Sequence, residues 1–213
     1  MPSLLINHKA DLHHPRAAAK ARLILAHGAG AACNSPFMLA LADALAGFNI
    51  EVQRFNFAYM QRSIEQASKK LPDKMPLLQQ HFMEQINAVD NSLPLFIGGK
   101  SMGGRVASML TAAKVKAIFA FGYPFHPPGK SQWRTDHFAS LPAPLFVVQG
   151  ERDPFGKRAE LTPFSWPKVS VYWLTAADHD FSPTKASGLT QQQLIASAAA
   201  YCNKKIDEIL LAS

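Results

Sequence analysis

The pentapeptide Gly99-Lys100-Ser101-Met102-Gly103 constrains the fold of this chain more than any other segment. The apolar run 95–97 before it predicts a buried strand, and apolar residues recur at helical spacing from Val106 to Ala113. A G-x-S-x-G sequence between a strand and a helix indicates a nucleophile elbow, a tight turn that lifts the serine hydroxyl above the edge of a sheet. Side chains at the two glycines would collide in such a turn, and we expect the serine backbone to be strained.

Strand-like and helix-like segments alternate along the rest of the chain. Short apolar or alternating runs predict further strands at 22–26, 50–55, 116–121, 145–149 and 169–174. Start and stop residues predict helices from Pro36 to just before Gly47 and from Pro76 to Val89, and a capping box at Thr190 begins a last helix. Residues 56–74 are interpreted as a polar stretch.

This alternation predicts an α/β fold. Strands that alternate with helices form right-handed crossovers, which give a mainly parallel sheet with helices on both faces. We expect about six to seven strands and one domain over residues 1–213, with residues 1–20 as an N-terminal extension or an edge strand. No large cap domain is expected.

Composition narrows the classes of partner. The 22 Lys and Arg outnumber the 15 Asp and Glu, which gives a formal charge of +7, but the densest basic clusters are only the pairs 69–70 and 204–205. Nucleic-acid binding needs a concentrated basic stripe, so we expect none. The two cysteines, Cys33 and Cys202, do not have the spacing of metal ligands. Since no apolar run reaches the roughly 18 residues that span a bilayer and no signal peptide is evident, we expect a cytoplasmic protein without membrane contact.

Two further residues complete a chemical argument that begins at Ser101. A serine hydroxyl is a weak nucleophile unless a histidine takes its proton and a carboxylate orients that histidine. Asp153 follows the predicted strand 145–149, and His179 follows the predicted strand 169–174. Ligands of parallel sheets sit outside the carboxyl ends of the strands, and the order Ser, Asp, His is the one that follows a nucleophile elbow. We therefore predict these three residues to be catalytic.

Each of these assignments has competitors. Glu151 is the alternative acid, although Asp153 lies deeper in the loop. Asp178 and Asp180 flank His179, but adjacent side chains seldom face each other, so we expect them to hold the loop. The rival histidines are His81, which falls in a predicted helix and is expected to be structural, and His126 and His137, which fall in the loop after residues 116–121.

The reaction also needs two donors for the oxyanion that forms at the substrate carbonyl. The amide of Met102 opens the predicted helix and supplies one. The second is expected from the loop after strand 22–26, where His27 is followed by Gly28-Ala29-Gly30. Ala29 is the preferred donor and Gly30 the alternative. The small residues of this loop let its backbone approach a ligand, so we predict that Gly30 contacts the substrate. We also predict that His27, at the start of the same loop, contacts it.

A long loop supplies the remaining substrate-binding candidates. Residues 123–142 exceed the usual length of connections in α/β proteins, which favours a functional rim or a small lid. We predict that Tyr123 and His126 line an apolar pocket there and that Arg134 receives an anionic group. A plain surface loop is the alternative.

Taken together, five segments make the chain resemble a small α/β-hydrolase of the compact dienelactone-hydrolase-like group; they are residues 25–30, 99–105, 122–130, 150–156 and 177–181. The resemblance runs from about residue 20 to the end of the chain. It implies the α/β-hydrolase fold and Ser101, Asp153 and His179 as a catalytic triad. Two departures stand out: dienelactone hydrolases use cysteine at the elbow, so their substrate does not carry over, and the first two strands of a full-length hydrolase are absent or reduced.

The leading hypothesis is a serine hydrolase that cleaves a small-molecule ester or thioester through an acyl-enzyme, with no metal or cofactor. The alternative is a non-catalytic binding or scaffold protein that keeps the fold, since some relatives of the compact group are subunits of regulatory complexes. Peptidase, acyltransferase and perhydrolase reactions can use the same triad, and the sequence does not predict the acyl chain length or the oligomeric state.

Overall fold

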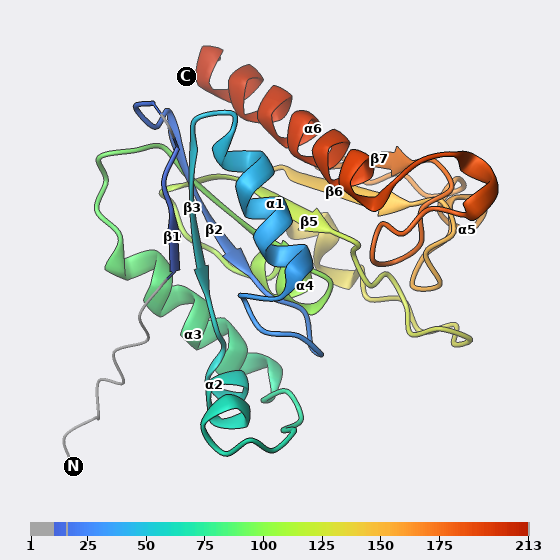
Figure 1. The fold of residues 1–213 in the computed structure, drawn as a ribbon, viewed down its shortest axis with the longest axis horizontal. Helices are drawn as coiled ribbons and strands as arrows, with labels where there is room; N and C mark the ends of the chain where they lie inside the picture. The colour runs from blue at the N-terminus through green and yellow to red at the C-terminus, as the bar shows by residue number, and fades with distance from the viewer. Residues whose placement is uncertain (1–10, 16, 213) are drawn as a thin grey trace.

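A seven-stranded sheet forms the centre of the protein (Figure 1). The computed structural model describes residues 11–15 and 17–212. The strand order is β1-β3-β2-β4-β5-β6-β7, and only the pairing of β1 with β3 is antiparallel. The strands are β1 (Asp11–His13), β2 (Ala21–Ala26), β3 (Ile50–Phe55), β4 (Leu95–Lys100), β5 (Val115–Phe121), β6 (Leu145–Gly150) and β7 (Val169–Leu174). This is the predicted α/β-hydrolase architecture.

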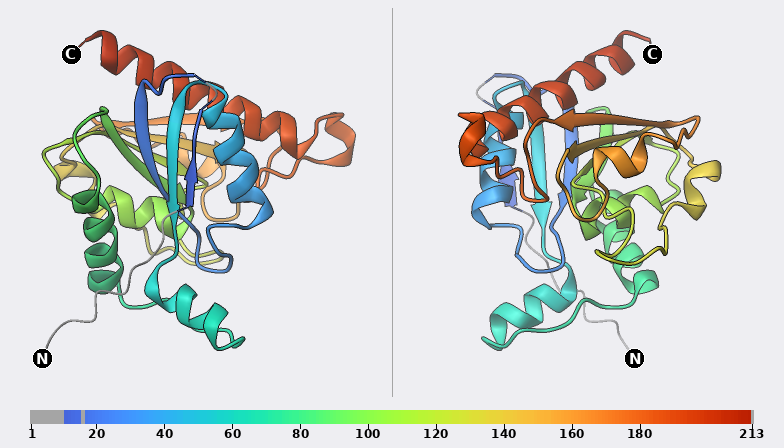
Figure 2. Two further views of the ribbon diagram at one scale, coloured as in Figure 1. Left: turned by 60° about the vertical axis from the view of Figure 1, so that its left-hand side comes forward. Right: turned by 90° about the vertical axis from the view of Figure 1, so that its right-hand side faces the viewer.

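Helices cover both faces of the sheet, as the alternation of elements requires. The helices are α1 (Pro36–Ala46), α2 (Ala58–Glu65), α3 (Met75–Ala88), α4 (Met102–Ser108), α5 (Arg158–Leu161) and α6 (Gln191–Leu211). Helices α1 and α6 pack together on one face over one apolar core, and α2, α3 and α4 contribute to a second core on the other face (Figure 2). Every residue of β4 is buried, which is why residues 95–99 are apolar rather than alternating with polar ones.

Three helices differ from the sequence predictions: α4 ends earlier than expected, and α2 and the four-residue α5 were not predicted. Helix α2 occupies the first half of the stretch interpreted as polar. Its sequence looks polar because only its first turn, Ala58 to Met60, is buried and the rest lies at the surface. One buried turn is too short to give a recognisable period. Helix α4 ends at Ser108 rather than near Ala113, and the Ser108 hydroxyl donates a hydrogen bond to the Arg105 carbonyl in its last turn.

The N-terminal segment adds an edge strand, β1, as one of the two expected arrangements. Residues 1–10, which belong to the same prediction, lie outside the described part of the chain. Cys33 and Cys202 are both buried free thiols. Within residues 11–15 and 17–212, no helix is long and apolar enough to cross a membrane.

Sheet topology places the loops that carry the predicted residues together. Strands β2, β4, β5, β6 and β7 run parallel, so the loops that follow them leave from the same edge of the sheet. Strands β6 and β7 are neighbours, as expected for the strands that precede Asp153 and His179.

Candidate active site

The turn between β4 and α4 has the strained geometry expected of a nucleophile elbow. Ser101 adopts φ 51° and ψ −115°, a region that a residue with a Cβ rarely occupies. A Cβ at Gly99 would lie 2.5 Å from the carbonyl carbon of Gly103, and a Cβ at Gly103 would lie 2.6 Å from the Ala26 and His27 carbonyl oxygens. The two glycines therefore allow the strand, the turn and the first turn of α4 to pack closely enough to hold the serine.

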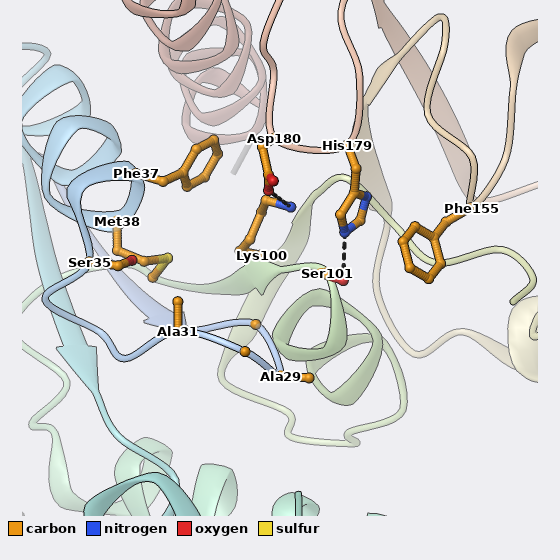
Figure 3. Close-up of a pocket in the computed structure, with 12 residues that line it drawn as sticks. Ala29, Ala31, Ser35, Phe37, Met38, Lys100, Ser101, Phe155, His179 and Asp180 are labelled. Carbon is orange, nitrogen blue, oxygen red and sulfur yellow. Dashed lines mark hydrogen bonds and ion pairs between the residues drawn. The ribbon is translucent and has the colours of Figure 1, made fainter. Parts of the chain in front are cut away.

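His179 connects Ser101 to Asp153; Figure 3 shows its ring and the bond to the Ser101 hydroxyl. Its Nε2 lies 2.9 Å from Ser101 Oγ, and its Nδ1 lies 2.8 Å from Asp153 Oδ2. A carboxylate only accepts hydrogen bonds, so Nδ1 carries the proton and Nε2 is free to accept the serine proton. The three side chains come from the ends of three different strands and form one continuous hydrogen-bonded chain.

Asp153 is fully buried, and its carboxylate is held by three donors. The Phe155 amide donates to Oδ1 at 2.8 Å, and the Gln149 side-chain amide donates to Oδ2 at 2.9 Å, beside the bond from His179. Gln149 also accepts from the Tyr123 amide at 2.8 Å. Gln149 was not among the residues predicted from the sequence. Its one signal was a polar residue at the end of an apolar strand.

The rival acids have structural roles. Glu151 accepts from Arg158 at 2.6 Å and from the Ala176 amide at 3.2 Å, so it ties two loops together rather than orienting His179. Asp178 Oδ1 accepts from the amides of Asp180 and Ser182, both at 2.9 Å, which stabilises the turn that carries His179. The two hydrogen bonds to Asp178 agree with the prediction that it holds its loop.

The rival histidines also lie in structural settings. His81 Nδ1 accepts from the Ala58 amide at 3.3 Å. His126 pairs with Glu160 at 3.2 Å, and His137 Nε2 lies 2.8 Å from the Ser108 hydroxyl.

The loop after β2 is held from beneath by buried side chains. His27 is fully buried; its Nε2 accepts from the Phe57 amide at 3.1 Å, so its Nδ1 carries the proton and donates to the Gly28 carbonyl at 2.6 Å. Burial lowers the pKa of His27 to about 4, although the bond to Gly28 opposes the change. The Tyr59 hydroxyl donates to the Ala29 carbonyl at 3.0 Å. The prediction that the His27 side chain contacts substrate is therefore corrected: it supports the loop.

A cavity of about 420 Å³ opens beside Ser101 and His179. The predicted Ala29 and Gly30 line it, as does Asp180. Sequence reasoning missed the other side chains of its wall, which come from the loop after β2, from α1, from β4 and from the loop after β6; they are Ala31, Ser35, Phe37, Met38, Lys100 and Phe155. The Phe155 ring lies 4.4 Å from the His179 ring, between ring centroids, and forms one side of the site (Figure 3).

Three predicted substrate-binding residues lie elsewhere. Tyr123 is fully buried and its hydroxyl donates to the Arg134 carbonyl at 2.9 Å. His126 packs edge-on against Trp133 at 5.2 Å between ring centroids. Arg134 lines a separate cavity with Arg105 and His137. These placements correct the predictions for Tyr123, His126 and Arg134, because the long loop turns back onto the second core instead of overhanging Ser101.

Within the described residues, no group of three or more His, Cys, Asp or Glu side chains is arranged to hold a metal ion.

Comparisons with known proteins agree with this architecture. A family model described as an alpha/beta hydrolase domain matches residues 19–207. A solved structure described as an alpha-beta serine hydrolase homologue from Coxiella burnetii superposes with a TM-score of 0.68 at 18% identity, covering 90% of each chain. Dienelactone hydrolase from Anabaena variabilis gives 0.66 at 19% identity over 92% of this chain and 88% of its own.

A third similar structure, Est1E from Butyrivibrio proteoclasticus with ferulic acid bound, has a TM-score of 0.69 at 12% identity and covers 93% of this chain and 95% of its own. At these identities the structures share a fold with this chain. No curated protein sequence matches it.

Proposed function

Because the chain belongs to the α/β-hydrolase family, we propose that it is a serine hydrolase that cleaves an ester or thioester through an acyl-enzyme. The observation that carries this proposal is the unbroken chain from Ser101 Oγ through His179 to the buried Asp153 carboxylate, with contacts of 2.9 and 2.8 Å. Three groups aligned in this way are what nucleophilic attack by a serine requires. The dienelactone hydrolase among the similar structures agrees with it.

The proposed reaction has two halves. Ser101 Oγ attacks the substrate carbonyl while His179 Nε2 takes the hydroxyl proton, and Asp153 stabilises the imidazolium that forms. The imidazolium then gives this proton to the leaving oxygen or sulfur, which departs and leaves an acyl-enzyme. Water enters, His179 takes one of its protons, and the resulting hydroxide equivalent attacks the acyl carbon. The acid leaves and Ser101 recovers its proton.

The oxyanion donors are proposed to be the amides of Met102 and Ala29. As the first residue of α4, Met102 has an N–H that the helix itself leaves unused. The carbonyl of Gly28 accepts from the buried His27 ring, which faces it toward the protein interior. In a trans peptide the C=O and the following N–H point in opposite directions, so the Ala29 N–H is directed away from the His27 ring, which supports Ala29 as the second donor.

Labelling with a fluorophosphonate probe tests the proposal directly. The native protein should react at Ser101, and Ser101→Ala should remove both labelling and turnover of ester substrates, by about 10⁴-fold or more, while the protein stays folded. Ser35→Ala is the matched control, since Ser35 also lines the cavity but its hydroxyl bonds to no histidine in the described part of the chain. This variant should still be labelled.

The alternative, a scaffold protein without catalysis, gives the opposite result. It predicts no labelling of the native protein and no cleavage of esters or thioesters across a range of acyl lengths. Labelling that persists in Ser101→Ala would also contradict the proposed nucleophile.

A further inference from the structure

Lys100 is an unusual residue to find beside a serine nucleophile. It is the variable position before Ser101 in the elbow, its side chain is only 8% exposed, and it lines the same cavity. Its stem lies against the loop after β2, since a Cβ added at Gly28 would be 3.7 Å from Lys100 Cγ. Figure 3 shows the side chain rising between Phe37 and His179. The ammonium group is therefore part of the site wall.

The charge of Lys100 is only loosely compensated. Asp180 Oδ1 lies 3.2 Å from Nζ, and among the described residues it is the one carboxylate within ion-pair distance. The Asp180 side chain is 70% exposed, so water already satisfies much of its charge. The Phe37 ring lies 5.4 Å from Nζ, measured to its centroid. An ammonium has three donors, and a single solvated carboxylate and an aromatic face leave capacity for another acceptor.

The rest of the cavity wall is apolar, so the unused hydrogen-bond donors of the Lys100 ammonium need an explanation. Ala29, Ala31, Phe37, Met38 and Phe155 give the cavity an apolar lining, and burial in such surroundings is unfavourable for an ammonium. Desolvation lowers the pKa of Lys100, while Asp180 opposes the change. A methionine or leucine would fill the same space without this penalty. A charge retained at such a place is explained by a ligand that pairs with it.

We propose that Lys100 forms an anion subsite, so that the ester or thioester cleaved at Ser101 carries a carboxylate or a similar negative group. This inference rests on the proposed function. The substrate anion displaces Asp180 from the ammonium or shares it, and a charge-assisted hydrogen bond in an apolar cavity is stronger than one in water. Lys100 thereby selects the substrate, and the triad carries out the reaction.

A structural interpretation of the same pair competes with this one. Lys100 precedes the nucleophile and Asp180 follows His179, so their ion pair also ties the elbow to the histidine loop. If that tie were its whole role, the pair would keep Ser101 and His179 in register for every substrate, charged or neutral.

Matched ester pairs distinguish the two interpretations. Monomethyl adipate against methyl hexanoate places the anion on the acyl side, and 3-acetoxybenzoate against phenyl acetate places it on the leaving-group side. Hydrolysis followed by pH-stat gives kcat/KM for each. We expect the native protein to prefer the anionic member of at least one pair by about tenfold or more. No preference in either pair overturns the proposal.

Two variants should move this preference in opposite directions. Lys100→Met should abolish it, and Asp180→Asn should increase it about threefold or more, because the ammonium loses its competing carboxylate. The matched control is Lys204→Met on α6, whose side chain is 71% exposed. It removes one positive charge far from the cavity and should leave the preference unchanged. A preference that survives Lys100→Met, or an Asp180→Asn variant that slows both esters equally, overturns the proposal.

A binding measurement separates failure of the subsite from failure of the proposed function. Ser101→Ala, which cannot form an acyl-enzyme, is titrated with monomethyl adipate by calorimetry, alone and combined with Lys100→Met. Binding that depends on Lys100 supports the subsite even if the native protein hydrolyses no ester. Hydrolysis of both esters at equal rates, with no binding dependent on Lys100, removes the subsite and leaves the serine hydrolase intact.

Discussion

The loops that leave β4 and β5 begin side by side at one edge of the sheet but have different fates. The loop after β4 is the single strained residue Ser101, and it delivers the nucleophile to the cavity. The segment after β5 runs from residue 122 to residue 144 and buries Tyr123, Phe125 and Phe138 against one another and Trp166. One connection serves the site, and the other mainly completes a core.

This difference shows what strand register does and does not determine. Ser101, Asp153 and His179 lie one to five positions beyond their strands and meet at the sheet edge, whereas Tyr123, two positions beyond β5, is turned into the core. A residue ten positions into a loop goes where its own apolar neighbours pack. Length and aromatic content made the long loop a candidate lid, but the same aromatic residues are what draw it away from Ser101.

The largest expected effect is on catalysis, at a residue held by a short connection. Asp153→Asn should lower kcat by about 10³- to 10⁴-fold, because an amide can donate to Nδ1 and favour the wrong histidine tautomer. Ester hydrolysis by purified, folded protein measures it. The matched control is Asp178→Asn, next to His179, whose loop contacts an amide oxygen can still accept. A similar loss in both variants would show that loop order, rather than the tautomer, matters.

On the long-loop side, the expected effect is on folding. Phe138→Ala should lower the free energy of unfolding by about 3–5 kcal/mol, because a 1% exposed ring is replaced by a cavity. Urea unfolding measures it, and kcat/KM of the folded protein should change little. Phe164→Ala, at a 44% exposed ring in the same aromatic group, should cost about 1 kcal/mol or less. A Phe138→Ala variant that is stable but inactive would show that the long loop contributes to catalysis rather than mainly to folding.

The support beneath the loop after β2 predicts a pH dependence. The pKa of His27 is about 4 in the folded protein and about 6.5 in the unfolded chain. Between these values the unfolded state binds more protons, so the free energy of unfolding should fall as the pH drops from about 6.5 to about 4, by roughly 3 kcal/mol.

Urea unfolding across this pH range should show a shallower dependence in His27→Gln, whose amide still accepts a hydrogen bond but does not titrate. His14→Gln, at a side chain that is 67% exposed, is the control. Equal slopes in all three proteins would exclude His27 as the cause.

The smallest expected effect is that of replacing Arg134, which tests whether the long loop after β5 reaches the substrate. Arg134→Ala should change kcat/KM for neutral and anionic esters by about twofold or less, because Arg134 lines a cavity apart from Ser101. The paired assay described for Lys100→Met measures both variants together. A selective loss with anionic esters in Arg134→Ala would mean that the long loop reaches the substrate after all.

The features that could be predicted from the sequence are those fixed by short stretches of chain, and the features that were missed depend on packing. The mainly parallel sheet, helices α1, α3 and α6 and the three residues after strands β4, β6 and β7 were predictable, because periodicity and short connections fix them locally. Gln149 and Lys100 were missed because their importance depends on burial. Sequence shows a polar residue in an apolar strand or a variable position in a motif, but not what surrounds it. Helix α2 was missed because one buried turn carries too little periodic signal.

The backbone conformation of Ser101 lowers the stability of the folded protein but positions the hydroxyl that the proposed reaction needs. Holding a side-chain-bearing residue at φ 51° disfavours the folded state by about 1–3 kcal/mol. Glycine at this position would relieve that burden and have no hydroxyl. Ser101→Gly would therefore stabilise the turn and remove the nucleophile in the same change.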